Sequence, residues 1–285
     1  MSIKTRIAPS PTGLFHIGTA RTAYFNYLFA KSQGGKFLVR IDDTDVNRNK
    51  TEYTDLIFDT LKKLDLDFDE TFAQSSRLDR YKEVAQQLLD DGKAIMVDGV
   101  INSDYDLNIH GLTSEWKDEI IGNVVCSKQD NIISSQITLI KADGNPTYNF
   151  ATVVDDIDSG ITDVIRGSDH ISNTLRQIFI YKLLDKDLPK FHHIGLLTQK
   201  GKKISKRDVL SDLKDYWQYD TRAILNYILK LGWNLPDPNI DQKYPLIDKT
   251  QAIQMFMDGK MRAANSNVDI NKLVWLDKKY SRMKP

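Results

Sequence analysis

Two short segments, far apart in the chain, carry residue types that could bind and use phosphate groups. Residues 9–18 (PSPTGLFHIG) place His16 and Gly18 directly before a helical pattern, and residues 203–207 (KISKR) place Lys203 and Lys206 in a short basic segment. A glycine at a helix start lets a phosphate approach backbone N–H groups, and the helix dipole favours an anion there. Either segment alone is a weak signal, since such loops are often only turns or solvated surface. Together they predict a nucleotide pocket beside a basic loop.

The chemistry that this combination favours is the activation of a carboxylate by ATP. A carboxylate that attacks the α-phosphate is already an anion, so no general base is required. The reaction needs in-line positioning and positive charge on the phosphates. Lys203 and Lys206 can supply that charge, and His16 can donate a hydrogen bond to a phosphate oxygen. We expect Mg²⁺ to accompany ATP.

Composition is typical of a soluble globular protein with one main domain and a smaller satellite. The 285 residues are 41% hydrophobic and 27% charged, and 39 basic residues balance 39 acidic ones. No apolar run approaches the ~18 residues of a membrane span, and residues 1–4 lack the apolar core of a secretory signal. The single cysteine, Cys126, excludes an intramolecular disulfide and argues against a structural zinc site. We expect a cytoplasmic monomer.

The order of the predicted elements indicates an α/β fold with a doubly wound parallel sheet. A strand at 3–7, a helix at 19–31 and a strand at 37–41 form a βαβ unit, and helices are predicted around 53–64 and 79–91. Residues 94–143 lack helical periodicity, with strands suggested at 132–140. The α/β rhythm resumes at 148–154 and 163–165, with a helix at 171–184 and a strand at 192–197. After the basic loop the pattern is helical to the end.

These patterns divide the chain into four parts. We expect the first half of a nucleotide-binding catalytic domain at 1–93, a small insertion at 94–143, the second half with the basic loop at 144–210, and a helical region at 211–285.

Six blocks, in order, closely resemble glutamyl-tRNA synthetases. They are 6–13 (RIAPSPTG), 16–22 (HIGTART), 40–45 (RIDDTD), 144–150 (GNPTYNF), 164–170 (VIRGSDH) and 203–207 (KISKR). The resemblance runs from about residue 4 to residue 280. It implies a class I synthetase fold and an enzyme that uses ATP, glutamate and tRNA.

The resemblance also implies roles for single residues. Arg6 resembles the arginine that pairs with the side-chain carboxylate of glutamate, a suitable task for a bidentate guanidinium. Ser10 and Tyr148 match positions that line the same pocket. Arg166 matches an arginine near the carboxylate end of the substrate, and Asp42 matches an acid that holds the substrate's ammonium group. By the same matching, His16 and Gly18 belong to the ATP signature, and Lys203 and Lys206 to the phosphate loop. Purely structural roles are the alternative for each residue: a surface ion pair for Arg6, a helix cap for Asp42 and a core position for Tyr148.

The chain departs from the family pattern at several places. Asp42 and Asp169 stand where glutamate is frequent, Thr152 where asparagine is frequent, and Thr19 replaces the second histidine of the general signature. The family usually carries a longer insertion and a helical anticodon-binding region beyond the point where this sequence stops. These departures concern substrate geometry and tRNA selection more than reaction class.

Four functions remain compatible with the sequence. The first is a glutamate–tRNA ligase that charges tRNA-Glu in two steps, of which the first typically waits for tRNA in this family. The second is the short paralogue that glutamylates queuosine in the anticodon of aspartate tRNA. That paralogue usually has a zinc motif with several cysteines, which Cys126 alone cannot supply. The others are a non-catalytic tRNA-binding module, disfavoured by the retained histidine and lysines, and a ligase that joins glutamate to a small amine.

Overall fold

The first half of the α/β unit consists of parallel strands and connecting helices, as predicted. The computed structural model describes residues 2–45, 49–104, 115–125, 136–199, 201–203, 212–234 and 246–283. The elements of the first half, in chain order, are β1 (Lys4–Ile7), α1 (Ile17–Lys31), β2 (Lys36–Ile41), α2 (Thr51–Lys63), β3 (Glu70–Ala73), the 3₁₀ helix η1 (Gln74–Arg77) and α3 (Leu78–Asp90). Strand β2 pairs in parallel with both β1 and β3.

The second half forms another parallel set. Its elements are α4 (Tyr148–Asp158), β9 (Asp163–Gly167), η3 (Ser168–His170), α5 (Ile171–Leu183) and β10 (Lys190–Ile194). Strands β9 and β10 are parallel neighbours over their whole length. The predicted strand at 192–197 is interrupted, because Gly195 separates β10 from β11 (Leu197–Gln199). The segment at 148–154 lies in α4.

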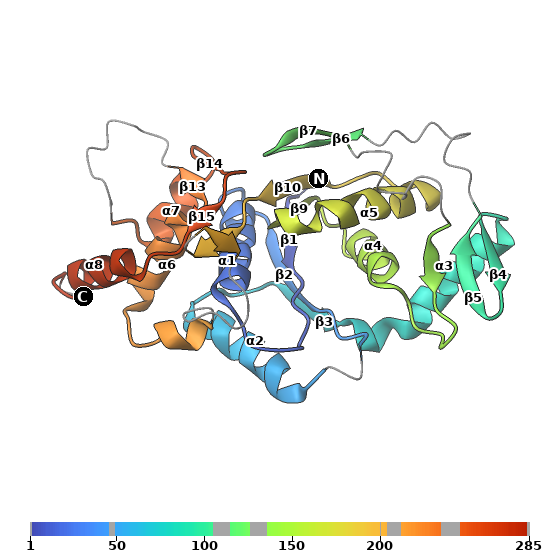
Figure 1. The fold of residues 1–285 in the computed structure, drawn as a ribbon, viewed down its shortest axis with the longest axis horizontal. Coiled ribbons are helices and arrows are strands. Elements are labelled where there is room, and N and C mark those ends of the chain that lie inside the picture. Colours follow the sequence, from blue (N-terminus) through green and yellow to red (C-terminus); the bar gives the residue numbers. More distant parts are fainter. Residues whose placement is uncertain are drawn as a thin grey trace.

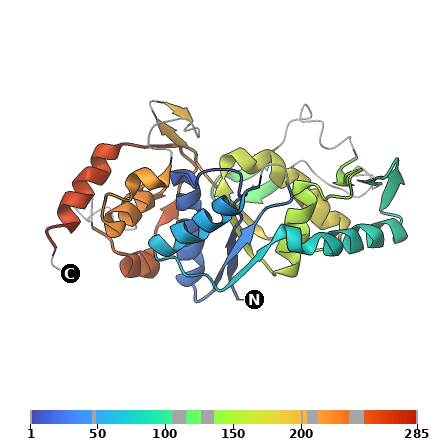
Figure 2. The same ribbon diagram turned by 90° about the horizontal axis from the view of Figure 1, so that it is seen from below.

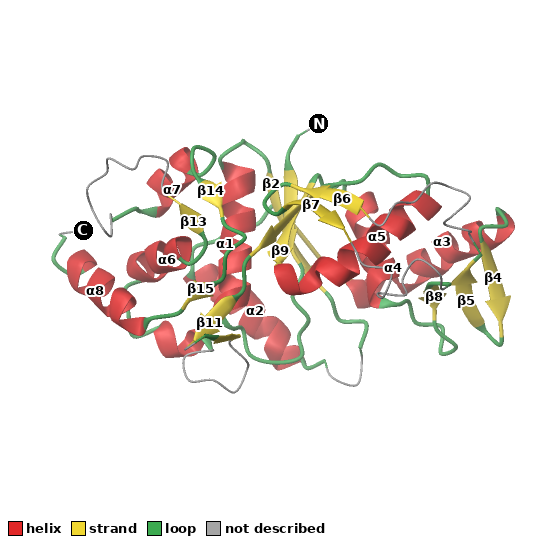
Figure 3. Ribbon diagram, turned by 45° about the horizontal axis from the view of Figure 1, so that its top comes forward, coloured by secondary structure: helices red, strands yellow, loops and turns green. Residues whose placement is uncertain are grey.

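The two halves meet where β1 and β9 lie side by side. The Lys4 N–H donates to Thr162 Oγ1 at 2.9 Å, and the Thr162 N–H donates to the Lys4 carbonyl at 2.9 Å. Figure 1 and Figure 3 show the strands in the middle of the molecule, with α1 on one side and α4 and α5 on the other. This confirms the predicted α/β fold with parallel strands. In such folds ligands bind beyond the carboxyl ends of the central strands.

The region between the halves contributes to two sheets. Strands β4 (Ala94–Val97), β5 (Val100–Ser103) and β8 (Thr138–Ile140) form a small antiparallel sheet next to α3. Strand β6 (Glu115–Asp118) instead pairs with β10, and β7 (Gly122–Val125) pairs antiparallel with β6. Part of the predicted insertion therefore extends the sheet of the second half.

The C-terminal region packs against α1 at one end of the molecule, opposite β4 and β5 (Figures 1 and 2). Its elements are η4 (Leu213–Tyr216), α6 (Thr221–Lys230), α7 (Lys249–Met255) and α8 (Ile270–Tyr280). Short strands also occur: β12 (Lys202–Lys203), β13 (Trp233–Asn234), β14 (Lys260–Met261) and β15 (Ser266–Asn267). The expectation of purely helical structure after the basic loop was therefore wrong, because Trp233–Asn234 and Ser266–Asn267 have strand partners.

Helix α1 is buried on nearly every face, which explains its apolar sequence. Ala20, Ala23, Phe25, Leu28 and Ala30 are all fully buried. A helix that is apolar all round must be covered on several sides, and α1 shares one hydrophobic cluster with β1, β2, α6, α7 and α8. Among the described residues, none of the helices is long and apolar enough to cross a bilayer.

Candidate active site

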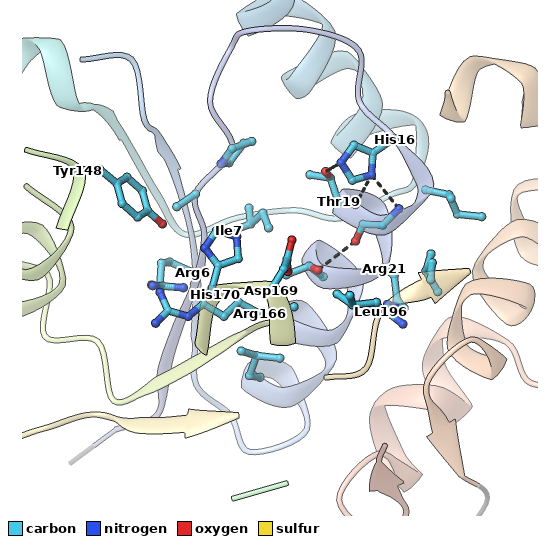
Figure 4. Close-up of a pocket in the computed structure, with 18 residues that line it drawn as sticks. Arg6, Ile7, His16, Thr19, Arg21, Tyr148, Arg166, Asp169, His170 and Leu196 are labelled. Atoms are coloured by element: carbon cyan, nitrogen blue, oxygen red, sulfur yellow. Dashed lines mark hydrogen bonds between the residues drawn. The ribbon is translucent and has the colours of Figure 1, made fainter. Parts of the chain in front are cut away.

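The largest concentration of predicted site residues surrounds a cavity at the carboxyl ends of β1 and β9. The cavity has a volume of about 240 Å³. Figure 4 shows that its lining comes from the end of β1, the start of α1, the end of β9 and η3. Five predicted residues line it: Arg6, His16, Gly18, Tyr148 and Arg166. Residues from four of the six sequence blocks and from both halves of the fold thus meet at one place.

His16 directly precedes α1 and caps its N-terminus. Its Nδ1 accepts from the backbone N–H groups of Gly18 at 3.1 Å and Thr19 at 3.3 Å, and its Nε2 lies 3.2 Å from Thr19 Oγ1. The N–H groups that the sequence predicts to be free for a phosphate are therefore bonded to the imidazole in this state. A Cβ at Gly18 would lie 3.0 Å from two atoms of that ring. The glycine is needed here for close packing against His16.

The segments that flank the basic loop are near this helix start. Lys203 ends β12, which pairs antiparallel with β11, and Asp212 forms an isolated antiparallel bridge with His16. The Leu213 N–H also donates to the Phe15 carbonyl at 3.0 Å. Lys206 lies outside the described residues, as does the side chain of Lys203. The chain therefore returns from the loop directly beside the predicted ATP signature.

Arg6 is buried and held by an acidic residue of α4. Its Nε lies 3.1 Å from Asp156 Oδ1 and its second terminal nitrogen 3.1 Å from Asp156 Oδ2. Arg40 of β2 donates to the same carboxylate at 2.6 Å. Burial favours the neutral form of Asp156, but the charges and hydrogen bonds of the two arginines outweigh burial and lower its pKa. Arg6 therefore belongs to a buried network that joins β1, β2 and α4, and it is not a surface ion pair.

Arg166 has different surroundings. One terminal nitrogen donates to Thr174 Oγ1 at 2.6 Å and Nε lies 3.3 Å from His193 Nε2, while the other terminal nitrogen is buried with no hydrogen-bond partner among the described residues. No carboxylate of the described residues forms an ion pair with it. Burial lowers its pKa to about 10, Tyr148 opposes this shift, and the nearby charge of Arg6 adds to it. A buried guanidinium without a counter-ion, facing a cavity, indicates a site for an anion.

Ser10 and Asp42 line a second hollow, with a volume of about 290 Å³, that shares Tyr148 with the first. The Asp42 carboxylate is paired with Arg40, with Oδ1 2.6 Å from Arg40 Nε. Burial raises the pKa of Asp42 despite that pairing. Tyr148 is 40% exposed, so it is not a core residue. Asp42 is therefore neither a helix cap nor a free acid in the main cavity.

Residues 2–99 and 108–275 match the catalytic domain of tRNA synthetases class I (E and Q). The chain belongs to this family. Glutamate–tRNA ligase of Nostoc punctiforme is 36% identical over the whole chain, which covers 68% of that protein. Glutamate–tRNA ligase 2 of Neorickettsia sennetsu is 43% identical over 87% of the chain, which covers 60% of that protein.

Solved structures of class I synthetases share this fold. Glutamate–tRNA synthetase from Elizabethkingia anophelis superimposes with a TM-score of 0.82 at 24% identity, over 99% of this chain and 71% of that one. The alignment with the Nostoc protein spans 333 positions, so that synthetase has additional residues within the region it shares with this chain of 285. The chain spans 60 to 68% of the length of the two curated synthetases named above.

Several residues that organise this synthetase site were not identified from the sequence. Asp156, Thr174 and His193 contact the two arginines, and His170 lines the cavity. The sequence does contain a signal for Asp156, because it is a charged residue within an apolar helical segment. Arg40 likewise interrupts an apolar strand, and a buried charge of each sign indicates a buried ion pair. Thr152, one of the departures from the family pattern, is buried in α4 and lines neither hollow.

The described part of the chain holds no group of three histidine, cysteine or acidic side chains placed to bind a metal ion. Cys126 lies outside the described residues.

Proposed function

We propose that this chain is a glutamate–tRNA ligase, which forms glutamyl-adenylate from glutamate and ATP and transfers the glutamyl group to the 3′ end of tRNA. One observation carries the proposal. Two buried guanidiniums, Arg6 and Arg166, line the same cavity as His16 and Gly18. Arg166 has no carboxylate partner among the described residues, and Arg6 keeps donors beyond its pair with Asp156, so each guanidinium can bind an anion. A dicarboxylic amino acid supplies two anionic groups, one for each arginine.

In this proposal Arg6 binds the side-chain carboxylate of glutamate and Arg166 lies at the other carboxylate. Arg6 uses two N–H groups on Asp156 and retains further donors, since a guanidinium has five. Asp156 thus fixes the plane of the Arg6 guanidinium and leaves some of its N–H donors for a substrate. Ser10, Asp42 and Tyr148 form the adjoining part of the substrate pocket. Since Asp42 is paired with Arg40, its contact with the ammonium group would need a bridging water or a shift of that pair.

The ATP end of the pocket lies at the start of α1. An oxygen of the α-carboxylate attacks the α-phosphorus, and the bond from that phosphorus to pyrophosphate breaks. His16 donates to a phosphate oxygen, and Lys203 and Lys206 neutralise charge on the leaving pyrophosphate. Mg²⁺ that enters with ATP would supply further positive charge. Gly18 allows the nucleotide to approach the helix. A ribose hydroxyl of tRNA then attacks the activated carbonyl and AMP leaves.

We assign these tasks to the four parts expected from the sequence. Residues 1–93 and 144–210 form the catalytic unit, 94–143 the insertion near the acceptor end, and 211–285 the region that contacts the tRNA stem.

The decisive experiment is transfer of radiolabelled glutamate, with ATP, onto total tRNA, followed by mild alkaline treatment and mapping of the labelled nucleotide. Label on the 3′-terminal adenosine of glutamate or glutamine tRNA supports the ligase. Label on the anticodon base of aspartate tRNA would replace the proposal with a queuosine-modifying enzyme. No label, with ATP still bound, would indicate a binding module, and label on a small amine would indicate a tRNA-independent ligase.

A further inference from the structure

Arg166 is held by neutral groups, unlike Arg6. The two hydrogen-bond partners of its guanidinium are the Thr174 hydroxyl and the imidazole of His193. A carboxylate partner would neutralise the guanidinium, whereas a hydroxyl and an imidazole leave its full charge for a ligand. Neutral partners orient a guanidinium only if their own hydrogens point away from it and their lone pairs point toward it. Arg166 can only donate, so the atoms facing it must accept.

The His193 ring is fixed from its other side by the region predicted to be an insertion. Nδ1 of His193 lies 2.6 Å from Oδ2 of Asp118, the last residue of β6. Asp118 also accepts from the backbone N–H groups of His193, Ile120 and Ile121. Burial would raise the pKa of Asp118, but these hydrogen bonds together lower it. Asp118 therefore stays ionised and accepts, which places the imidazole hydrogen on Nδ1.

This tautomer leaves Nε2 of His193 as an acceptor. Nε2 lies 2.8 Å from Thr174 Oγ1 and 3.3 Å from Arg166 Nε. Burial lowers the pKa of His193, and the Arg166 charge adds to this effect, while Asp118 opposes it. A protonated ring would direct a second donor at Arg166. His193, Asp118 and Thr174 are all essentially inaccessible to solvent, so water cannot replace any of these contacts.

We propose that Asp118 and His193 are positioning residues: the pair sets the imidazole tautomer that holds Arg166 with one terminal nitrogen free to bind the substrate carboxylate. This inference rests on the proposed function, since it takes Arg166 as the carboxylate anchor. It gives β6 a role at the amino-acid end of the pocket. The hydrogen bonds run from Asp118 of β6 to His193 of β10 and from there to Arg166 of β9, and these are three neighbouring strands of one sheet.

The fold contains a matched control. His192, the preceding residue of β10, forms a buried pair with Asp163 of β9 at 2.8 Å. Neither His192 nor Asp163 lines the cavity. Loss of this second pair should weaken the same sheet without disturbing Arg166, so it separates a structural effect from a positioning effect.

The test compares His193→Asn with His192→Gln. Asparagine at 193 can still donate to Asp118, but its shorter side chain places no acceptor where His193 Nε2 lies, and glutamine at 192 can still donate to Asp163. We expect His193→Asn to raise KM for glutamate about 10- to 100-fold while KM for ATP changes less than about twofold. His192→Gln should change neither constant, although both variants lower the melting temperature. Equal glutamate KM values in the two variants would overturn the inference.

A second measurement does not depend on activity. Long-range ¹H–¹⁵N spectra of the histidine-labelled protein should show His193 with its hydrogen on Nδ1. Asp118→Asn should move it to Nε2, because the asparagine oxygen would accept from the Ile120 and Ile121 N–H groups and its NH2 group would then face Nδ1. Asp163→Asn serves as the control. A hydrogen on Nε2 in the unsubstituted protein would contradict the proposal. Failure of the unsubstituted protein to use glutamate would refute the proposed function instead, whatever tautomer His193 has.

Discussion

Arg6 and Asp156, which are 150 positions apart in the sequence, form a buried two-point ion pair. The pair joins the first strand of the fold to a helix of the second half. Asp156 also accepts from Arg40 at 2.6 Å, so one carboxylate serves two guanidiniums. Arg6 therefore has both a structural partner and a place in the cavity, and substitution of Arg6 alone would mix the two effects. Arg166 lacks such a partner and is the cleaner probe of the substrate site.

Arg166→Lys should weaken the use of glutamate and leave ATP binding nearly unchanged. Lysine retains a charge but cannot contact Thr174, His193 and a substrate together, because it lacks the planar fork. We expect KM for glutamate to rise about 10- to 100-fold, equivalent to about 1.5–3 kcal/mol for a hydrogen bond to a charged group. Steady-state kinetics with each substrate varied would measure this. Arg77→Lys, at a half-buried arginine outside the cavity, is the control, and a matching rise there would contradict the assignment.

Asp156→Asn should destabilise the fold. The substitution removes the carboxylate that neutralises Arg6 and Arg40 in a site closed to water, and breaking a buried pair costs about 3–5 kcal/mol. Urea unfolding would report the change in free energy. Glu83→Gln removes an exposed ion pair with Arg80 and should cost no more than about 1 kcal/mol. A small effect of Asp156→Asn would mean that other groups or water compensate the arginines.

Gly18→Ala should separate activity from stability. The new methyl group would meet the His16 ring at 3.0 Å and displace it, while alanine favours a helix more than glycine does by up to about 1 kcal/mol. The amount of glutamyl-adenylate formed per second should fall about tenfold or more if His16 orients the phosphates. The melting temperature should stay the same or rise. Full activity with a displaced His16 ring would remove the histidine from the mechanism.

Lys206→Ala is expected to slow activation by about 100-fold or more, because charge on the phosphates is a main source of rate in this chemistry. The expectation rests on the proposed function and on the match of residues 203–207 (KISKR) to the family's phosphate loop. Aminoacylation and melting temperature would be measured together, with Lys62→Ala of α2, an exposed lysine that lines neither hollow, as the control. Unchanged turnover would exclude a role of Lys206 at the phosphates.

Acid should destabilise the protein between about pH 6.5 and pH 4 through His170. Burial lowers the pKa of this histidine to about 4, and the charge of Arg166 adds to the shift. The unfolded chain then takes up the proton first, so stability falls as pH falls through this window and is recovered above it. Each pKa unit corresponds to at most about 1.4 kcal/mol, and partial exposure of His170 reduces the effect. Urea unfolding at several pH values should show a flatter profile for His170→Asn. An unchanged profile would show that His193 or other groups dominate acid sensitivity.

Much of this molecule follows from local sequence. The apolar strand at 37–41 and the helix that follows His16 are encoded within a few residues, and the structure confirms them as β2 and α1. Helix α1 begins two residues before the predicted start at 19, so Gly18 lies in its first turn. The α/β class follows from the same alternation. Even the convergence of Arg6, His16 and Arg166 was predictable, because parallel strands present their carboxyl ends at one edge.

Only the tertiary structure decided how the charges are shared. Arg6 with Asp156, and Asp118 with His193, are separated by 150 and 75 positions. No periodicity encodes such partners, since their choice depends on which strands become neighbours and how much water the fold removes. Burial then determines which arginine is neutralised and which keeps its charge. The sequence determined the chemical groups and the edge of the sheet at which they meet, and packing determined that Arg6 is tied to an acid while Arg166 is left to bind one.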